Sequence, residues 1–188
     1  MGFLQNYLPS YPRTLNIALA SIFAALVCVA TILFKIPVPA TEGYFNIGEI
    51  FIYIAAILFG PIIGGFAGGV GAGLADALSG YLNFAPATLI IKFCEGFFIG
   101  FIIFKLRLKY WEGWRKRWLL SGIVVVGGLI MVIGYFIYET ILYGLIPALG
   151  EVPINFIQLG IGLIVAVPAS IGIQIAYPII EFPSKEVN

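Results

Sequence analysis

The chain has 188 residues, of which 61% are hydrophobic and 10% are charged, whereas a soluble domain is about 45–50% apolar and about 25% charged. This composition is typical of an integral membrane protein. The net charge of +1 argues against a nucleic-acid-binding surface, and the sequence has no histidine, the commonest general base and metal ligand. We therefore expect a protein that is not an enzyme, with no catalytic site, metal or cofactor.

The first predicted span covers residues 15–34, after a short interfacial segment at residues 1–14. It is uncharged and 20 residues long, which is enough to cross about 30 Å of hydrocarbon. Ala20 and Ala24 are four residues apart and therefore share a helix face. This pair either simply favours the helix or forms a docking face for another helix.

Residues 35–46 are predicted to form a loop, because Pro37 and Pro39 exclude a helix. The loop is long enough to fold over a site. A short second span follows at residues 47–59. The third span, at residues 61–78, begins at once because proline is favourable at a helix start. Glycines that repeat every four residues predict close helix packing there; they are Gly60, Gly64 and Gly68 in one row, and Gly65, Gly69 and Gly73 in the other.

Three further spans are predicted at residues 87–104, 119–143 and 153–177, with a turn at residues 79–86. A hydrophilic connector at residues 105–118 and a loop at residues 144–152 join them, and a tail follows at residues 179–188. The expected fold is thus an all-α membrane protein, with six transmembrane helices in one bundle that forms a single domain at residues 15–178.

An even number of spans places both termini and the 105–118 connector on one side of the membrane. The positive-inside rule makes that side cytoplasmic, because it holds eight cations against Lys35 alone on the other side. The eight are Arg13, Lys105, Arg107, Lys109, Arg115, Lys116, Arg117 and Lys185.

Ionisable groups inside membrane spans are energetically unfavourable and therefore indicate function. The predicted spans contain five of them, all toward the outer leaflet: Glu49, Asp76, Lys92, Glu95 and Glu139. Charge pairing that merely holds helices together is the alternative interpretation. Four acids share one base, however, so pairing alone leaves the group unbalanced.

Uncharged polar side chains are expected at the same level of the bundle, and they include Tyr44, Asn46, Asn83, Thr88, Tyr135, Asn155 and Gln158. Aromatic walls with a few hydrogen-bonding groups are the usual composition of a small-molecule site. We therefore predict an outward-facing binding site, with the 35–46 loop as a possible lid.

Three stretches of the sequence resemble a known family. They are NIGEIFIYIAAILFGPIIGGFAGGVGAGLADALSGYLNFAPATLIIKFCEGFFIG at residues 46–100, GYFIYE at residues 134–139, and the Pro-x-Asn-x-x-Gln run at residues 153–158. Together they are similar to the substrate-binding (S) components of energy-coupling factor (ECF) vitamin transporters, in the riboflavin-type branch. The resemblance extends over residues 14–178.

The resemblance implies a multi-pass protein of the prokaryotic cell membrane that binds its vitamin from outside with high affinity. It also implies the partners of such a subunit: a transmembrane coupling (T) subunit and two cytoplasmic ATPases that drive uptake. Riboflavin is the first expected substrate. A thiamin-related pyrimidine or folate is the alternative, because related subunits bind other vitamins. A self-sufficient carrier and a membrane scaffold without ligand are the two rival classes.

The resemblance also implies roles for residues. Ala20 and Ala24 would contact the coupling subunit, and aromatic rings such as Phe84 could stack on a flat vitamin ring. The expected substrate-binding residues are Tyr44, Asn46, Glu49, Asn83, Phe84, Thr88, Lys92, Glu95, Tyr135, Glu139, Asn155 and Gln158.

Overall fold

The computed structural model describes residues 12–38, 41, 43–108 and 113–177. Much of the predicted 1–14 segment, the 179–188 tail and parts of the 35–46 loop and the connector, including Lys109, lie outside these residues. The described elements are α2 (Arg13–Leu33), β1 (Ile36–Val38), β2 (Gly43–Phe45), α3 (Glu49–Phe59), α4 (Pro61–Leu78), α5 (Ala85–Lys105), α6 (Gly113–Tyr143) and α7 (Leu145–Ala176).

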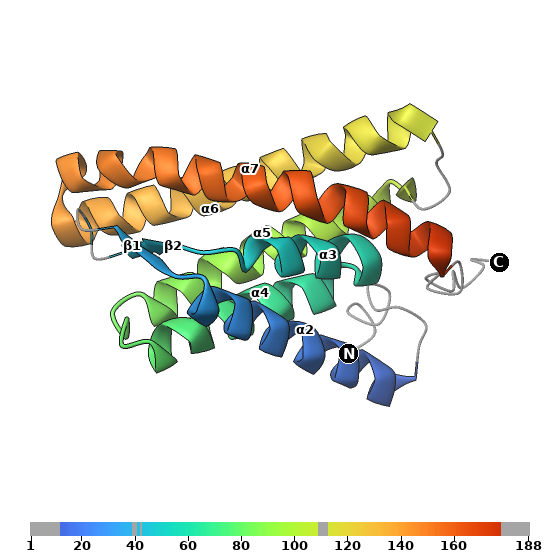
Figure 1. Ribbon diagram of the computed structural model, residues 1–188, viewed down its shortest axis with the longest axis horizontal. Helices are drawn as coiled ribbons and strands as arrows, with labels where there is room; N and C mark the ends of the chain where they lie inside the picture. The colour runs from blue at the N-terminus through green and yellow to red at the C-terminus, as the bar shows by residue number, and fades with distance from the viewer. Residues whose placement is uncertain (1–11, 39–40, 42, 109–112, 178–188) are drawn as a thin grey trace.

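The helices form one elongated bundle (Figure 1). The two longest, α6 and α7, lie side by side, α4 packs between α2 and α5, and α3 contacts α4, α5 and α7. The β1–β2 ribbon and the α4–α5 and α6–α7 turns lie at one end of the bundle, which we call the ribbon end. The start of α2, the end of α7 and the end of α5 lie at the opposite end. This arrangement of ends agrees with the predicted topology, while the side of the membrane that each end faces stays a prediction.

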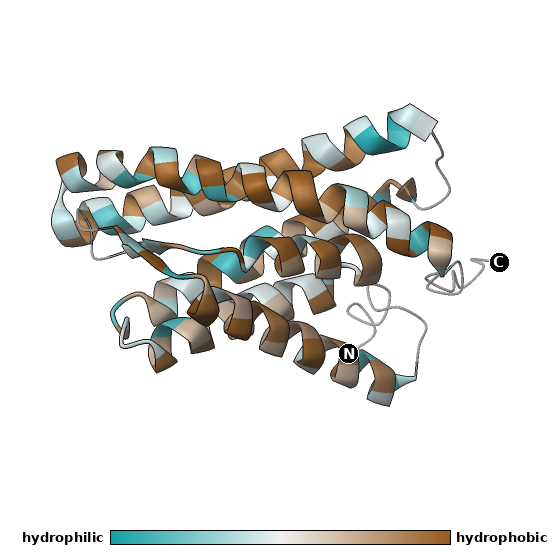
Figure 2. Cartoon of the chain, in the orientation of Figure 1, coloured by the Kyte–Doolittle hydropathy of each residue, from teal (hydrophilic) through white to brown (hydrophobic). Residues whose placement is uncertain are grey.

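Five of the six described helices are long and apolar enough to cross a membrane. Brown, hydrophobic positions run along most of α2, for example (Figure 2). The exception is α3, whose 11 residues extend only about 16 Å at 1.5 Å per residue. The part of the chain that the structure describes has six helices where six transmembrane helices were expected, but the second of them, α3, is too short to be a full span. Residues from Ile52 to Phe59 are all at most 9% exposed, so α3 is an interior helix enclosed by its neighbours.

The predicted loop at residues 144–152 is wrong, because α7 begins at Leu145 and continues through Pro153. Only Gly144 separates α6 from α7, and its φ of 91° is a left-handed conformation that glycine adopts without a Cβ clash. The interior Pro153 removes one helical hydrogen bond without ending the helix. The remaining predicted spans agree with the observed helices, apart from an earlier start of α6 at Gly113.

The predicted loop at residues 35–46 contains a small antiparallel ribbon, so the description as all-α is incomplete. Ile36 pairs with Phe45, and Val38 pairs with Gly43. Pro37 lacks an N–H donor and lies in a two-stranded ribbon, where a strand has a free edge that tolerates proline. The ribbon therefore gives defined positions to side chains that the sequence places only in an irregular segment.

The glycine rows of α4 allow the close packing that their spacing predicts. A Cβ atom added to Gly68 would lie 2.6 Å from the backbone oxygen of Lys92, and one added to Gly69 would lie 2.7 Å from that of Leu89. A Cβ at Gly64 would lie 2.7 Å from Cα of Ala56 in α3. Only glycine lets α4 approach the backbones of α3 and α5 this closely.

We predict that Gly68→Ala destabilises the protein by about 1–3 kcal/mol, because the added methyl group overpacks the contact with the α5 backbone. The matched control is Gly160→Ala, since a Cβ there meets nothing within 4 Å. Alanine also has the higher helix propensity, by about 0.5–1 kcal/mol, so the control variant should be neutral or stabilised. Thermal unfolding of both detergent-purified variants measures the difference, and equal melting temperatures would contradict the packing role of Gly68.

Candidate functional site

Polar side chains surround a cavity at the ribbon end of the bundle. All five long helices, β2 and the residues preceding α3 and α5 contribute to its wall. The lining residues are Thr31, Gly43, Tyr44, Asn46, Ala72, Asp76, Phe84, Thr88, Lys92, Tyr135, Glu139, Glu151, Asn155 and Gln158. Its volume, measured over the positions that the centre of a water molecule can take, is about 30 Å³. That is room for only a few waters, so a vitamin-sized ligand requires the cavity walls to move apart.

A larger hollow of about 360 Å³ adjoins this cavity. Gly43 and Phe84 line both spaces, so they form the boundary between them. Phe84 is stacked on Tyr143 with a centroid distance of 6.1 Å. The other lining residues of this outer hollow are Pro37, Val38, Gly80, Tyr81, Asn83 and Tyr143 itself. The outer hollow thus lies beside the inner cavity and against the ribbon.

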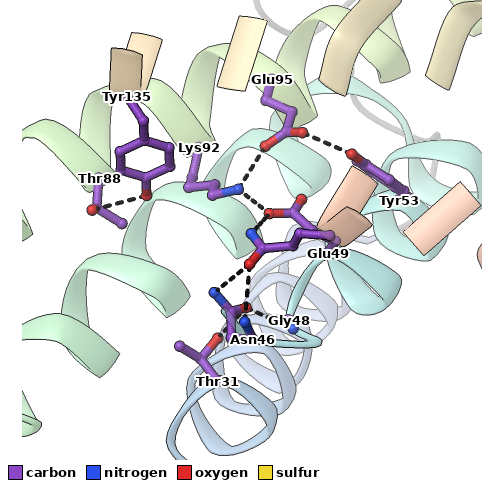
Figure 3. Close-up of polar contacts among 10 residues, drawn as sticks. Thr31, Asn46, Gly48, Glu49, Tyr53, Thr88, Lys92, Glu95 and Tyr135 are labelled. Carbon is purple, nitrogen blue, oxygen red and sulfur yellow. Dashed lines mark hydrogen bonds and ion pairs between the residues drawn. The ribbon is translucent and has the colours of Figure 1, made fainter. Parts of the chain in front are cut away.

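Lys92 is the centre of a buried ion cluster at the cavity (Figure 3). Its ammonium pairs with Glu49 of α3 and, at 3.2 Å, with Glu95 on the next turn of α5. The Tyr53 hydroxyl donates to Glu95 at 2.9 Å, and the Gln158 amide donates to Glu49 at 2.8 Å. All five side chains are at most 3% exposed. The cluster therefore ties α3, α5 and α7 together with charge-assisted bonds.

Asn46 joins the ribbon to three helices. Its backbone N–H and its side-chain amide both donate to Gln158 Oε1 on α7, at 2.9 and 3.2 Å. Its Oδ1 accepts the backbone N–H of Gly48 at 2.9 Å and the Thr31 hydroxyl of α2 at 3.4 Å. Figure 3 shows this chain of contacts running from Thr31 toward the Lys92 cluster. Asn46 thereby fixes the position at which the chain enters α3.

Aromatic hydroxyl groups complete the walls. The Tyr44 hydroxyl donates to Asp76 of α4, and the Tyr135 hydroxyl donates to Thr88 Oγ1 at 3.0 Å (Figure 3). Burial, together with the neighbouring carboxylate of Asp76, raises the pKa of the Tyr44 phenol far above its ordinary value. The Tyr44 phenol therefore remains protonated and acts as a donor at physiological pH. The Lys92 ammonium also lies 5.5 Å from the centre of the Tyr135 ring, within cation–π range.

Two acidic side chains line the cavity from the last turn of α6 and the first turns of α7. These side chains, Glu139 and Glu151, are only 1% and 3% exposed. The Oε2 atom of each has no hydrogen-bond partner, and neither does the Nδ2 atom of Asn155, one turn after Glu151. These three groups line the cavity, so unused hydrogen-bonding capacity is concentrated in one part of its wall.

The structure brings most of the predicted substrate residues to this cavity. Those that line it are Tyr44, Asn46, Phe84, Thr88, Lys92, Tyr135, Glu139, Asn155 and Gln158. Glu49 and Glu95 do not line it, because both bond to Lys92 from behind the wall. Asn83 lines only the outer hollow, and its backbone oxygen accepts the Tyr138 hydroxyl.

Sequence reasoning missed five lining residues: Thr31, Gly43, Ala72, Asp76 and Glu151. Asp76 stands out in the sequence as an acid within a span, although it was not assigned to the substrate site. Glu151 was missed because residues 144–152 were predicted as a loop. Its spacing of four residues from Asn155 and seven from Gln158 is the signal of a shared helix face that could have identified it.

The predicted docking pair on α2 is only partly accessible. Ala24 is 6% exposed, and its backbone oxygen lies against Gly71 of α4, while Ala20 packs against the core. The small side chains that α2 exposes near this pair include those of Ser21 and Ala25. The contact of Ala20 and Ala24 with a partner stays a prediction, and any such contact must extend over these exposed neighbours. Among the described residues, no His, Cys, Asp or Glu side chains form a group that could hold a metal.

We predict that Lys92→Met destabilises the protein by about 3–5 kcal/mol, since it leaves two buried carboxylates without their counter-ion. Adding Glu49→Gln to this variant removes one of the unpaired charges and should restore part of the loss. Melting temperatures of the single and double variants in detergent test this. A double variant less stable than Lys92→Met would contradict the pairing.

Comparison with known proteins identifies close relatives. The family model described as "ECF-type riboflavin transporter, S component" matches residues 13–175. An uncharacterized protein from the gap 3′ region of Pyrococcus woesei is 42% identical over 139 residues, which cover 74% of this chain and 88% of the relative. The thiamine precursor transporter HmpT of Lactococcus lactis subsp. cremoris (strain MG1363) is 31% identical over 152 residues, which cover 80% of this chain and 82% of HmpT.

Solved structures share the fold at lower identity. The S component of a bacterial ECF transporter superposes with a TM-score of 0.60 at 19% identity, over 89% of this chain and 99% of the other. The S component for biotin from an ECF-type ABC transporter superposes with a TM-score of 0.62 at 19% identity, over 95% of each chain. The two structures share the fold of this chain. The family model covers nearly the whole chain, and the chain therefore belongs to the S-component family of ECF-type transporters, as a multi-pass membrane protein.

Proposed function

We propose that this chain captures a vitamin or vitamin precursor in the cavity at the ribbon end and delivers it to an ATP-driven uptake complex. The observation that carries the proposal is the concentration of buried polar groups in a membrane bundle. Such groups are energetically unfavourable in a membrane and therefore indicate a functional site. Aromatic rings and convergent hydrogen-bonding groups, as in this cavity, suit a small heterocyclic ligand.

Riboflavin is the first candidate, and the description of the matching family supports it. Its flat ring could stack on Phe84 or Tyr135, which line the cavity. Asn155 and Gln158 offer amide groups for ring edges or hydroxyls. This assignment requires the inner cavity and the outer hollow to merge, because the inner space alone is far too small for a flavin.

A thiamine-precursor pyrimidine is the second candidate. HmpT, at 31% identity, is a thiamine precursor transporter. A single six-membered ring also requires less opening of the cavity than a flavin does. Folate is a larger molecule and receives no support from the described residues.

The sequence shows no nucleotide-binding motif, so a chain of this kind that is driven by ATP would take its energy from partners. We propose that a T subunit and two cytoplasmic ATPases supply the energy, with the end of the bundle opposite the ribbon facing the cytoplasm. The docking surface would include the exposed face of α2 around Ser21 and Ala25, where small side chains permit close approach of another helix.

Reconstitution into proteoliposomes tests this division of labour. We predict ATP-dependent uptake of radiolabelled riboflavin or 4-amino-5-hydroxymethyl-2-methylpyrimidine only when the T subunit and ATPases are present. Ala25→Trp should reduce uptake by about tenfold or more, because a bulky side chain prevents close helix contact, and should leave ligand binding unchanged.

The matched control is Ile133→Trp, which places the same side chain at a 55% exposed position on α6, far from α2 in the sequence. It should leave both uptake and binding unchanged. Uptake by the chain alone would contradict the proposal and indicate a self-sufficient carrier. Loss of binding in Ala25→Trp would contradict the assignment of α2 to docking.

A further inference from the structure

The cavity has more acidic than basic groups among its described lining residues. Asp76, Glu139 and Glu151 line it, and Lys92 is the only cationic side chain among the described residues that do so. The Lys92 charge is already compensated by Glu49 and Glu95. Lys35 also lies near the ribbon, but its ammonium is placed over the Tyr81 ring, 4.8 Å from the ring centre. No described cation therefore lies against Glu139 and Glu151.

The unused hydrogen-bonding atoms at this acidic wall are mainly acceptors. Oε2 of Glu139 and Oε2 of Glu151 have no partner, and neither does Nδ2 of Asn155. The three side chains are 1%, 3% and 5% exposed. Buried polar atoms without partners are unfavourable, and a ligand that supplies donors to the two carboxyl oxygens would relieve that condition.

The carboxyl oxygens of Glu139 and Glu151 favour one kind of ligand edge. Because an ionised carboxylate is an acceptor only, a ligand edge that carries N–H donors or a positive charge would complement this wall. A ligand edge made of acceptors would oppose the carboxyl oxygens.

Gly43 lies directly against this wall. A Cβ atom added to Gly43 would lie 2.9 Å from Cδ of Glu151. The Glu151 carboxyl therefore lies against the backbone of the ribbon, and Gly43 lines both the inner cavity and the outer hollow. On α6, Tyr135 lies one turn before Glu139 and offers an aromatic face beside the acidic pair.

We propose that the Glu139–Glu151 pair is the recognition site for the cationic or N–H-donating edge of a planar heterocycle, of the aminopyrimidine type. This inference rests on the proposed function and narrows its substrate class. An amino group beside a protonated ring nitrogen presents two parallel N–H donors, which match a carboxylate in a two-pronged, charge-assisted arrangement. Riboflavin presents mainly carbonyl and ring-nitrogen acceptors at its polar edge, together with one ring N–H, and fits this wall less well.

Binding to the unmodified protein gives the first test. The probes are 4-amino-5-hydroxymethyl-2-methylpyrimidine, the analogue in which a hydroxyl group replaces its amino group, and riboflavin. Isothermal titration of the detergent-purified chain should show the amino compound binding about tenfold or more tightly than its hydroxyl analogue, a difference that charge-assisted pairing can supply. Equal affinities for the two pyrimidines would overturn the inference.

Substitution of the pair gives the second test. Glu139→Gln and Glu151→Gln keep the side-chain volume and remove the negative charge. Each should weaken the binding of the amino compound by about tenfold and reduce its preference over the hydroxyl analogue. Thr140→Val is the matched control on α6, because its hydroxyl bonds to the backbone of Phe136 and does not line the cavity. Affinity of the amino compound that is unchanged in both Gln variants would overturn the inference.

The outcome also separates this inference from the function on which it rests. Tight binding and ATP-dependent uptake of riboflavin, without binding of the aminopyrimidine, would overturn the inference and leave the transport function standing. Failure of all three probes to bind or to be taken up with the T subunit and ATPases would count against both.

Discussion

The pairing of one buried ammonium with two carboxylates holds the functional end of this protein together. Lys92 bonds to Glu49 and Glu95, and all three side chains are at most 2% exposed. Because these side chains are buried inside the bundle, an unpaired member would find little water as an alternative partner. The short helix α3 is too small to anchor itself across the membrane, and the Glu49–Lys92 pair fixes its first turn against α5. Gln158 extends the same network to α7.

The glycines of α4 provide the steric condition for this arrangement. Because Gly68 has no side chain, α4 lies against the backbone of Lys92 itself. That proximity brings Asp76, two turns further along α4, into the same cavity wall as Lys92 and Thr88. Lipid provides little hydrophobic force between helices, so close packing of small residues and polar bonds must hold the bundle together. Here the close packing at Gly68 and the ion pairs of Lys92 act at the same point of α5.

Much of the fold can be predicted from the sequence, because long apolar segments and glycine periodicity depend on local composition. The failures have local physical causes. The last span was predicted to start at Pro153, but a proline inside a helix removes one hydrogen bond and need not end it, so the helical position of Glu151 was missed. The ribbon formed by β1 and β2 depends on pairing across a turn that composition does not reveal. The brevity of α3 reflects enclosure by neighbouring helices, which is a tertiary property.

The candidate site was predictable as a group of residues, but the pairing within it was not. Intramembrane polarity alone points to Lys92, Glu139 and Asn155, because each is unfavourable in lipid. It does not tell which acids neutralise Lys92 and which remain available to a ligand. The structure makes that distinction by placing Glu49 and Glu95 behind the wall, and Glu139 and Glu151 within it.

The central claim is that each chain binds one small heterocycle in the cavity beneath the ribbon. Native mass spectrometry can test it on the detergent-purified chain and on Gly43→Trp, with an equimolar mixture of riboflavin and 4-amino-5-hydroxymethyl-2-methylpyrimidine. Gly43 lines both the cavity and the outer hollow, so an indole there should fill the boundary between them. The account predicts a single adduct with one ligand per unmodified chain and none on the variant. An adduct that persists on Gly43→Trp, or no adduct on either protein, would contradict it.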